Sequence, residues 1–110
     1  MPLPREFTPD EIASIGDTIV EEDFRSRGLV CTWNTKESEP KYLEVLKGSV
    51  KLLICIKTVL YPEVIGELDE DESLQLRRRA KQIGYFPLVA KVRITSAGKP
   101  VGLFELKAVA

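Results

Sequence analysis

A short, almost uninterrupted apolar run in the middle of the chain constrains the fold more than any other feature. Within residues 50–58, positions 52–56 read Leu-Leu-Ile-Cys-Ile. This run is much shorter than the roughly 20 residues that span a bilayer. A strand with apolar side chains on both faces is typical of the centre of a sheet, where both faces are covered. We therefore expect residues 50–58 to form a central strand with other elements packed on each side.

Two segments have the pattern of the helices that such a sheet needs. The first begins at Thr8-Pro9-Asp10-Glu11, with a capping threonine, proline at the first helical position and acids in the first turn, and it ends at Gly28. The second is capped by Asp69, with Glu72 three residues later, and it ends at Gly84. Apolar residues recur at helical spacing in both, namely Ile12, Ile15, Ile19, Val20 and Phe24 in the first and Leu76, Ala80 and Ile83 in the second.

The remaining strands follow from short apolar or alternating segments. We expect strands at 29–33 and 41–46, a turn at 47–49, a strand at 87–94, a turn at 96–100 and a closing strand at 101–109. In the closing strand, Phe104, Leu106 and Ala108 share one face. Residues 59–68 fit neither period, and residues 1–7 resemble a flexible tail. The sequence thus predicts a single α/β domain over residues 8–110, with a mixed sheet flanked by two main helices in the order α-β-β-β-α-β-β.

Composition excludes several classes of function. The net charge of −1 lacks the positive excess of a free-standing nucleic-acid binder. The chain has no histidine, which removes the commonest general base, the usual zinc ligand and the centre of a Ser-His-Asp triad. Two cysteines and no leader predict reduced thiols in a cytoplasmic protein, with Cys31 and Cys55 pairing only if they lie on neighbouring strands. No cofactor and no metal are expected.

Several segments resemble the C-terminal domain of the archaeal tRNA-splicing endonuclease. They are Asp23-Phe24-Arg25-Ser26-Arg27-Gly28-Leu29-Val30, Arg78-Arg79-Ala80, Leu88-Val89-Ala90 and residues 98–104. The resemblance spans roughly residues 17–107. It implies a nuclease fold of the restriction-endonuclease and resolvase group, in which a tyrosine, a histidine and a lysine cleave RNA without a metal.

This chain lacks that triad. Leu46 stands at the tyrosine position, the lysine position falls near Gly84, and the histidine has no candidate. The resemblance therefore implies a catalytically inactive structural subunit of a heteromeric enzyme, with a catalytic endonuclease subunit and precursor tRNA as its partners. A homodimer contact through the C-terminal strand is compatible with this role.

A second resemblance, to archaeal Holliday-junction resolvases, covers residues 40–48 and 53–58. Those enzymes hold Mg²⁺ with an aspartate on the second strand and a Glu-x-Lys on the third. Here Lys41 and Cys55 replace the two carboxylates, Lys57 is retained, and only a shift of register would bring Glu44 into the site. The alternative hypothesis is accordingly a degenerate resolvase-like protein that acts as a DNA-binding or regulatory homodimer.

The expected contacts lie in the C-terminal half. The residues predicted to contact nucleic acid are Arg77, Arg78, Lys81, Lys91 and Arg93, beside Arg79. The competing interpretation of the helix is a solvated face neutralised by the acids at 67–72. The residues predicted to contact another subunit, on the closing strand with apolar residues on both faces, are Val101, Leu103, Glu105 and Lys107.

Overall fold

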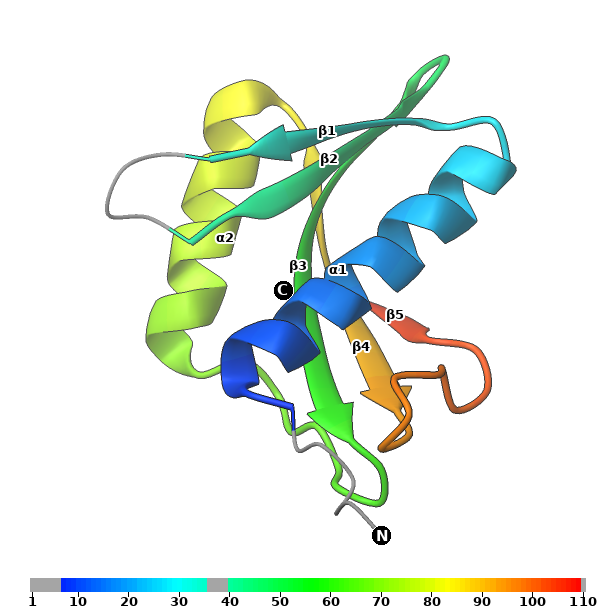
Figure 1. Ribbon diagram of the computed structural model, residues 1–110. Helices are drawn as coiled ribbons and strands as arrows, with labels where there is room; N and C mark the ends of the chain where they lie inside the picture. The colour runs from blue at the N-terminus through cyan, green and yellow to red at the C-terminus, as the bar shows by residue number, and fades with distance from the viewer. Residues whose placement is uncertain (1–6, 36–39, 110) are drawn as a thin grey trace, which may run out of the picture.

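The structure, a computed structural model, describes residues 7–35 and 40–109. One five-stranded sheet lies between two helices, one on each face (Figure 1). The described elements are, in chain order, α1 (Pro9–Ser26), β1 (Val30–Asn34), β2 (Tyr42–Lys47), β3 (Val50–Leu60), α2 (Glu70–Ile83), β4 (Phe86–Ile94) and β5 (Glu105–Ala108). This confirms the predicted α/β class and the predicted order of helices and strands.

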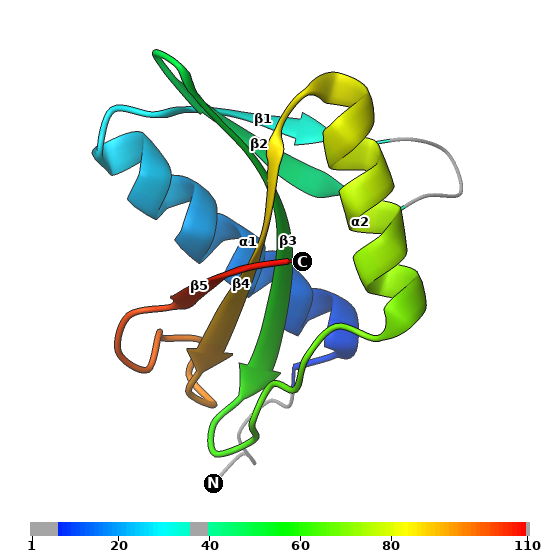
Figure 2. The same ribbon diagram turned by 180° about the vertical axis from the view of Figure 1, so that it is seen from behind.

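The sheet is mixed, and its strands follow the chain order from β1 to β5. Neighbouring strands are antiparallel except β3 and β4, which are parallel over residues 52–60 of β3. A parallel pair needs a crossover connection, and α2 lies on that connection, packed against β3 and β4 (Figure 2). None of the described helices is long and apolar enough to cross a membrane.

The apolar run lies where the sequence predicts it, in the third of the five strands. Ile54 belongs to the core beneath α1, and Leu53 belongs to the core beneath α2. Both side chains are fully buried. The period of a strand sends successive side chains to opposite faces, so a run of apolar residues serves both cores at once.

Both helices begin as their sequences predict. Thr8 and Asp69 each form a capping box, with Glu11 and Glu72 respectively as the third residue of the helix. Helix α2 ends at Gly84, which has the left-handed conformation at φ 75°. One position on α2 departs from the expected polar face, because Arg79 is buried, with 9% of its surface exposed.

The C-terminal strand differs most from the expectation. It covers only residues 105–108 instead of 101–109, and all four of its residues are exposed. Ile94 pairs with Pro100, whereas Lys91 pairs with Glu105, so the register slips by two residues between these positions. Gly102, at φ 68°, lies within the slipped segment. Phe104 packs on the α1 core and lines a hollow together with Leu106, but Leu106 is 42% exposed and Ala108 is exposed, so this face of the closing strand is covered chiefly at Phe104.

Three smaller expectations also have outcomes. Strand β3 continues to Leu60, two residues beyond its predicted end. Cys31 lies on β1 and Cys55 on β3, with β2 between them and their side chains in different cores, so they are not on neighbouring strands and both are free. Residues 1–6 of the predicted tail, residues 36–39 between the strands predicted at 29–33 and 41–46, and Ala110 lie outside the described residues.

Candidate nucleic-acid interface

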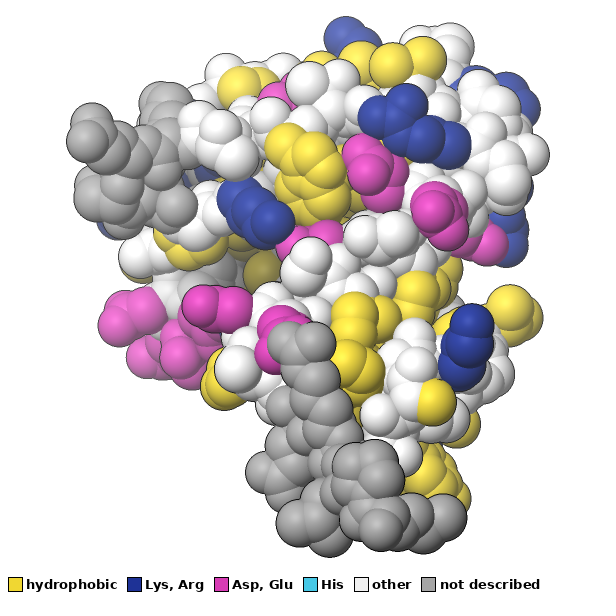
Figure 3. Space-filling view, in the orientation of Figure 1, with side chains coloured by type: hydrophobic (Ala, Val, Ile, Leu, Met, Phe, Trp, Pro, Cys, Tyr) yellow, Lys and Arg dark blue, Asp and Glu magenta, His cyan; other side chains and the backbone are white. Residues whose placement is uncertain are grey.

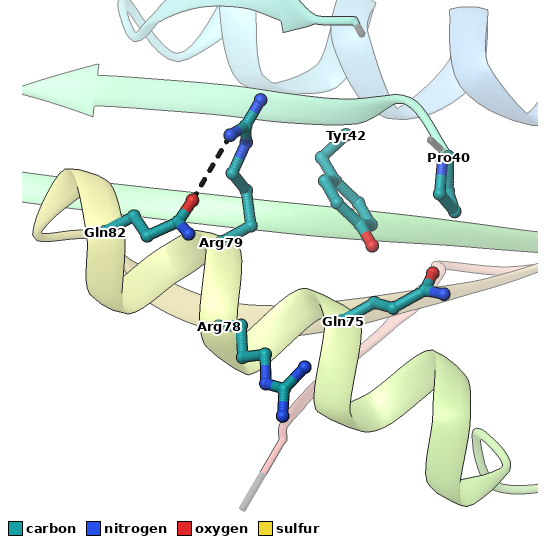
Figure 4. A pocket seen from close by; sticks show the side chains of 6 residues that line it. All are labelled: Pro40, Tyr42, Gln75, Arg78, Arg79 and Gln82. Carbon is teal, nitrogen blue, oxygen red and sulfur yellow. Dashed lines mark hydrogen bonds between the residues drawn. The ribbon is translucent and has the colours of Figure 1, made fainter. Parts of the chain in front are cut away.

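A groove of about 260 Å³ lies between α2 and the beginning of β2. Its lining includes two arginines and two glutamines of α2 (Figure 4). The residues are Pro40, Tyr42, Gln75, Arg78, Arg79 and Gln82. Gln75, Arg78 and Gln82 are three and four residues apart, so they lie on successive turns of the same helix face.

The two arginines of the groove have different surroundings. Arg79 extends toward β2, whereas Arg78 points away from the strands (Figure 4). The Nε and one terminal nitrogen of Arg79 donate to Asn34 Oδ1 at 3.3 and 3.2 Å, and its other terminal nitrogen donates to Gln82 Oε1 at 3.3 Å. Arg79 therefore holds α2 against β1, and Arg78 is the arginine that solvent or a ligand reaches.

Asn34 extends this network into the sheet. Its Nδ2 donates to Glu44 Oε2 at 2.7 Å. Burial raises the pKa of Tyr85, and its side-chain hydrogen bond with Glu44 raises it further. The hydrogen bonds that link Gln82, Arg79, Asn34 and Glu44 fix the wall of the groove. In this network the side-chain oxygen of Asn34 accepts from Arg79, and its side-chain nitrogen donates to Glu44.

The exposed cations of α2 are Arg77, Arg78 and Lys81, and they lie in its C-terminal half. Within the described part of the chain, none of the three has a salt-bridge partner. The acids of the predicted neutralising run lie at the other end of the helix, where Glu70, Asp71 and Glu72 form the first turn. The acidic and basic parts of α2 are thus separated along the helix axis.

The other two predicted contact residues lie elsewhere. Lys91 has only 11% of its side chain exposed and bonds to Glu67 at 3.5 Å. Arg93 lies over the ring of Tyr61, 6.0 Å from its centroid. Both line a second hollow, which Val64, Ile65, Leu103 and Glu105 complete. The five predicted residues therefore form two groups, and the α2 groove contains only Arg78 among them.

Glu67 holds the segment before α2 against the last two strands. It accepts from Lys91 and also from Lys107 on β5. The hydrogen bond from Lys107 lowers the pKa of Glu67, against the opposing effect of desolvation. The charge of Lys91 is therefore paired within the chain. Lys107 is paired with the same carboxylate, although it lies on the exposed strand β5.

Among the described residues, the face of the molecule that carries α1 shows no comparable grouping of cations. On the α1 side, Lys and Arg side chains alternate with Asp and Glu side chains (Figure 3). Two such pairs are Arg25 with Glu21 and Arg27 with Asp23, at 3.2 and 3.1 Å. The exposed cations of α2 are therefore the better candidates for contact with a phosphate backbone.

The residues of the resolvase-like pattern do not converge. Lys41 Nζ lies 2.8 Å from Asp17 Oδ2 on α1 and 4.8 Å from the centroid of the Trp33 ring. Lys57 lies on the other side of the sheet, in an ion pair with Glu72 of α2. Positions 41 and 57 thus contribute to opposite faces, and Glu44 is bonded to Asn34. Among the described residues, no three His, Cys, Asp or Glu side chains are placed so that they could hold a metal ion together.

The predicted subunit-contact residues lie along the sheet edge. Val101 donates its N–H to the Arg93 carbonyl at 2.8 Å and is half-buried. Leu103 is 88% exposed, and Glu105 and Lys107 are exposed on β5. Leu103, Glu105 and Lys107 therefore lie on one surface. Val101 instead belongs to the hairpin that follows β4.

Sequence reasoning missed the glutamines and the role of Arg79. The spacing of Gln75, Arg78 and Gln82 is visible in the sequence and was a usable signal for a polar helix face. Asn34 gave no such signal, because it is 45 residues from Arg79 along the chain. No family model and no curated protein matches this chain.

Proposed function

We propose that the chain is a non-catalytic, nucleic-acid-binding subunit built on a nuclease-like fold. In its specific form it is the structural subunit of a heteromeric tRNA-splicing endonuclease, supporting intron excision by a catalytic partner. The α-β-β-β-α-β-β order and the mixed sheet between two helices support the nuclease-like, resolvase-type architecture. The segments that resemble the splicing endonuclease support the specific form.

The observation that carries the proposal is that the exposed cations of α2 have no salt-bridge partner among the described residues, whereas the lysines of the nuclease pattern are paired. Arg77, Arg78 and Lys81 are exposed along half of α2, beside the groove. Lys41 and Lys57, which occupy positions of the nuclease pattern, are each committed to an internal ion pair. Exposed cations beside a groove suit the gripping of a phosphate backbone.

The decisive experiment combines binding and cleavage. The isolated chain is expected to bind intron-bearing precursor tRNA and to leave it uncut, with or without Mg²⁺. A complex purified from the native source is expected to contain a histidine-bearing endonuclease subunit and to excise the intron. Cleavage by the isolated chain, abolished by Lys57→Ala, would show that the chain is itself an enzyme.

One observation favours the resolvase-like alternative. Glu72 on α2 places a carboxylate beside Lys57, which is the retained lysine of that pattern. A DNA-binding or regulatory homodimer would prefer a four-way DNA junction to intron-bearing tRNA. A competition experiment between these two nucleic acids at one fixed salt concentration separates the two functions.

A further inference from the structure

We propose that one end of the sheet docks the protein on an anionic lipid surface, with apolar side chains entering the interface and lysines facing the lipid phosphates. This end, called the hairpin end, consists of residues 26–30, 46–52 and 83–87. The inference goes beyond the proposed function, because it uses neither the groove beside α2 nor the exposed cations of that helix.

The register of the sheet brings the three segments together. The paired residues are Val30 with Leu46, Lys47 with Val50, and Leu52 with Phe86. Strands β1, β3 and β4 therefore begin at the hairpin end, and β2 ends there. Both helices also end there, because α1 leads into β1 and α2 leads into β4 through short connections (Figure 1).

Three apolar side chains are exposed at the hairpin end. Val30 is 60% exposed, Val50 is 46% exposed and Phe86 is 55% exposed. Leu52 packs against the α1 core, so Val50, two residues before it, and Phe86, opposite it, project on the α1 face. Cys31 belongs to the α1 core, so Val30 projects on the α2 face. Apolar surface thus lies on both faces of the same end.

The hairpin end contains cations and no acid. Its charged residues are Arg27, Lys47 and Lys51. Arg27 is paired with Asp23 of α1 at 3.1 Å. Lys47 and Lys51 are exposed, and neither has a salt-bridge partner within the described part of the chain. Lys47 Nζ donates to the Arg27 carbonyl at 3.3 Å, a contact that leaves the lysine charge without a carboxylate.

Acids gather at the far ends of the two helices. The first turn of α1 contains Asp10 and Glu11, and the first turn of α2 contains Glu70, Asp71 and Glu72. From the lengths of the helices, these turns lie about 20–25 Å from the C-terminal ends of α1 and α2. An anionic surface therefore attracts the hairpin end and repels the other end, which orients the molecule.

An open hollow of about 420 Å³ lies between the β2–β3 hairpin and the connection from α2 to β4. Its lining includes Ser49, Val50, Lys51, Tyr85 and Phe86. The Ser49 hydroxyl and the Lys51 ammonium are hydrogen-bond donors that suit a phosphate. Val50 and Phe86 offer apolar contact to the glycerol and acyl groups beside that phosphate. The lining thus complements both parts of a phospholipid.

A lipid surface accounts for this combination better than a nucleic acid does. A phosphate backbone pairs with lysines, but it leaves Val30 and Val50 in water, because aliphatic side chains do not stack on bases. Peripheral binding to a membrane increases with the apolar area that is buried and with attraction to anionic lipids. The hairpin end supplies both, and each of its lysines is expected to contribute about fivefold to the affinity.

The test is sedimentation with lipid vesicles in the absence of nucleic acid. The wild type is expected to sediment with vesicles of equal parts phosphatidylglycerol and phosphatidylcholine, and to stay in the supernatant with pure phosphatidylcholine. Lys51→Glu reverses one charge and is expected to weaken binding to the anionic vesicles by about fivefold or more. Phe86→Ser keeps the charge and is expected to weaken binding by about the same factor, because the phenyl ring no longer leaves water.

Two substitutions at the other end of β4 are the matched controls. Lys99→Glu reverses an exposed charge, and Leu103→Ser removes an apolar side chain that is 88% exposed. Both are expected to bind as the wild type does. A wild type that does not sediment with the anionic vesicles overturns the inference, as does a loss of binding that is equal for Phe86→Ser and Leu103→Ser.

A second measurement uses a conservative substitution and so avoids a folding defect. The fluorescence of Phe86→Trp, after subtraction of the wild-type spectrum of Trp33, is expected to shift to shorter wavelength when anionic vesicles are added. An unshifted spectrum overturns the inference. Weaker tRNA binding by Lys51→Glu, without vesicle binding by the wild type, would assign the hairpin end to nucleic acid instead. Because neither vesicle measurement contains tRNA or DNA, failure here is distinct from failure of the proposed function.

Discussion

Gly16 on α1 and Thr58 on β3 are in such close contact that only a residue without a Cβ fits at position 16. A Cβ built on Gly16 would lie 1.7 Å from Thr58 Oγ1 and 2.7 Å from Thr58 Cβ. Gly16 is buried within the helix, where glycine otherwise costs about 1 kcal/mol relative to alanine. The close approach of α1 to the central strand is the reason for a glycine in this helix.

Gly16→Ala is therefore expected to destabilise the protein, in spite of the better helix propensity of alanine. Forcing one methyl group into a packed contact costs about 1–3 kcal/mol, because the helix must move away from the sheet. Chemical denaturation measures the free energy of unfolding. Gly66→Ala is the matched control, since a Cβ at Gly66 meets nothing within 4 Å. Equal stability of the two variants would contradict the contact.

Arg79→Ala is expected to lower the free energy of unfolding by about 1.5–3 kcal/mol, the range for hydrogen bonds to charged groups. Arg79 is buried and donates to both Asn34 and Gln82. Arg77→Ala, an exposed arginine on the same helix, is the matched control and should stay within about 0.5 kcal/mol of the wild type. A large effect of Arg77→Ala together with a small effect of Arg79→Ala would reverse the assignment of the two residues.

The elements of the fold were predictable because their signals are local. The capping residues Thr8 and Asp69 and the stop at Gly84 each act within one helical turn, and the apolar run of β3 identifies a strand covered on both faces. The register of β5 was not predictable, because it depends on how the chain passes Gly102 before it rejoins β4. For that reason the sequence pattern gives no sign that Leu106 is exposed whereas Phe104 packs on the core.

The candidate site was predictable only in part. The cations of α2 are visible as a cluster, but their separation into the buried Arg79 and the exposed Arg77 and Arg78 is set by contacts with Asn34, far away in sequence. Lys91 resembles a further phosphate contact in the sequence, and its bond to Glu67 depends on the path of the segment before α2. Side chains whose partners are distant in sequence carry no local signal of their role.

The ion pair of Lys57 and Glu72 stabilises the folded protein at neutral pH, and this stabilisation is expected to be lost at alkaline pH. Burial lowers the pKa of Lys57, but the hydrogen bond with Glu72 and the neighbouring negative charge reverse this, so that the pKa is raised above its ordinary value of 10.5. A raised lysine pKa stabilises the folded state below the unfolded pKa, and this contribution is lost as the pH rises through the folded pKa.

Glu72→Gln is expected to destabilise the protein at pH 7 by up to about 1 kcal/mol, since both side chains are more than one third exposed. Glutamine retains the capping role at this position, so the comparison isolates the charge. The difference from the wild type should diminish above the ordinary lysine value of 10.5. Lys57→Met and the double variant complete a mutant cycle at pH 7. A coupling energy of zero would show that the pair contributes nothing.

Nucleic-acid binding through α2 predicts a specific dependence on salt. Each phosphate contact contributes roughly 0.7–0.9 to the slope of log affinity against log salt concentration, because binding releases counterions. Arg78→Ala, at the groove, and Lys81→Ala are each expected to reduce this slope by about that amount, as measured by fluorescence anisotropy with a precursor-tRNA fragment. Lys99→Ala is the control for loss of one exposed cation away from α2, and Lys91→Ala tests a cation already bonded to Glu67. Both should leave the slope unchanged, whereas a loss at Lys91 equal to that at Arg78 would place the nucleic acid on the β4 side instead.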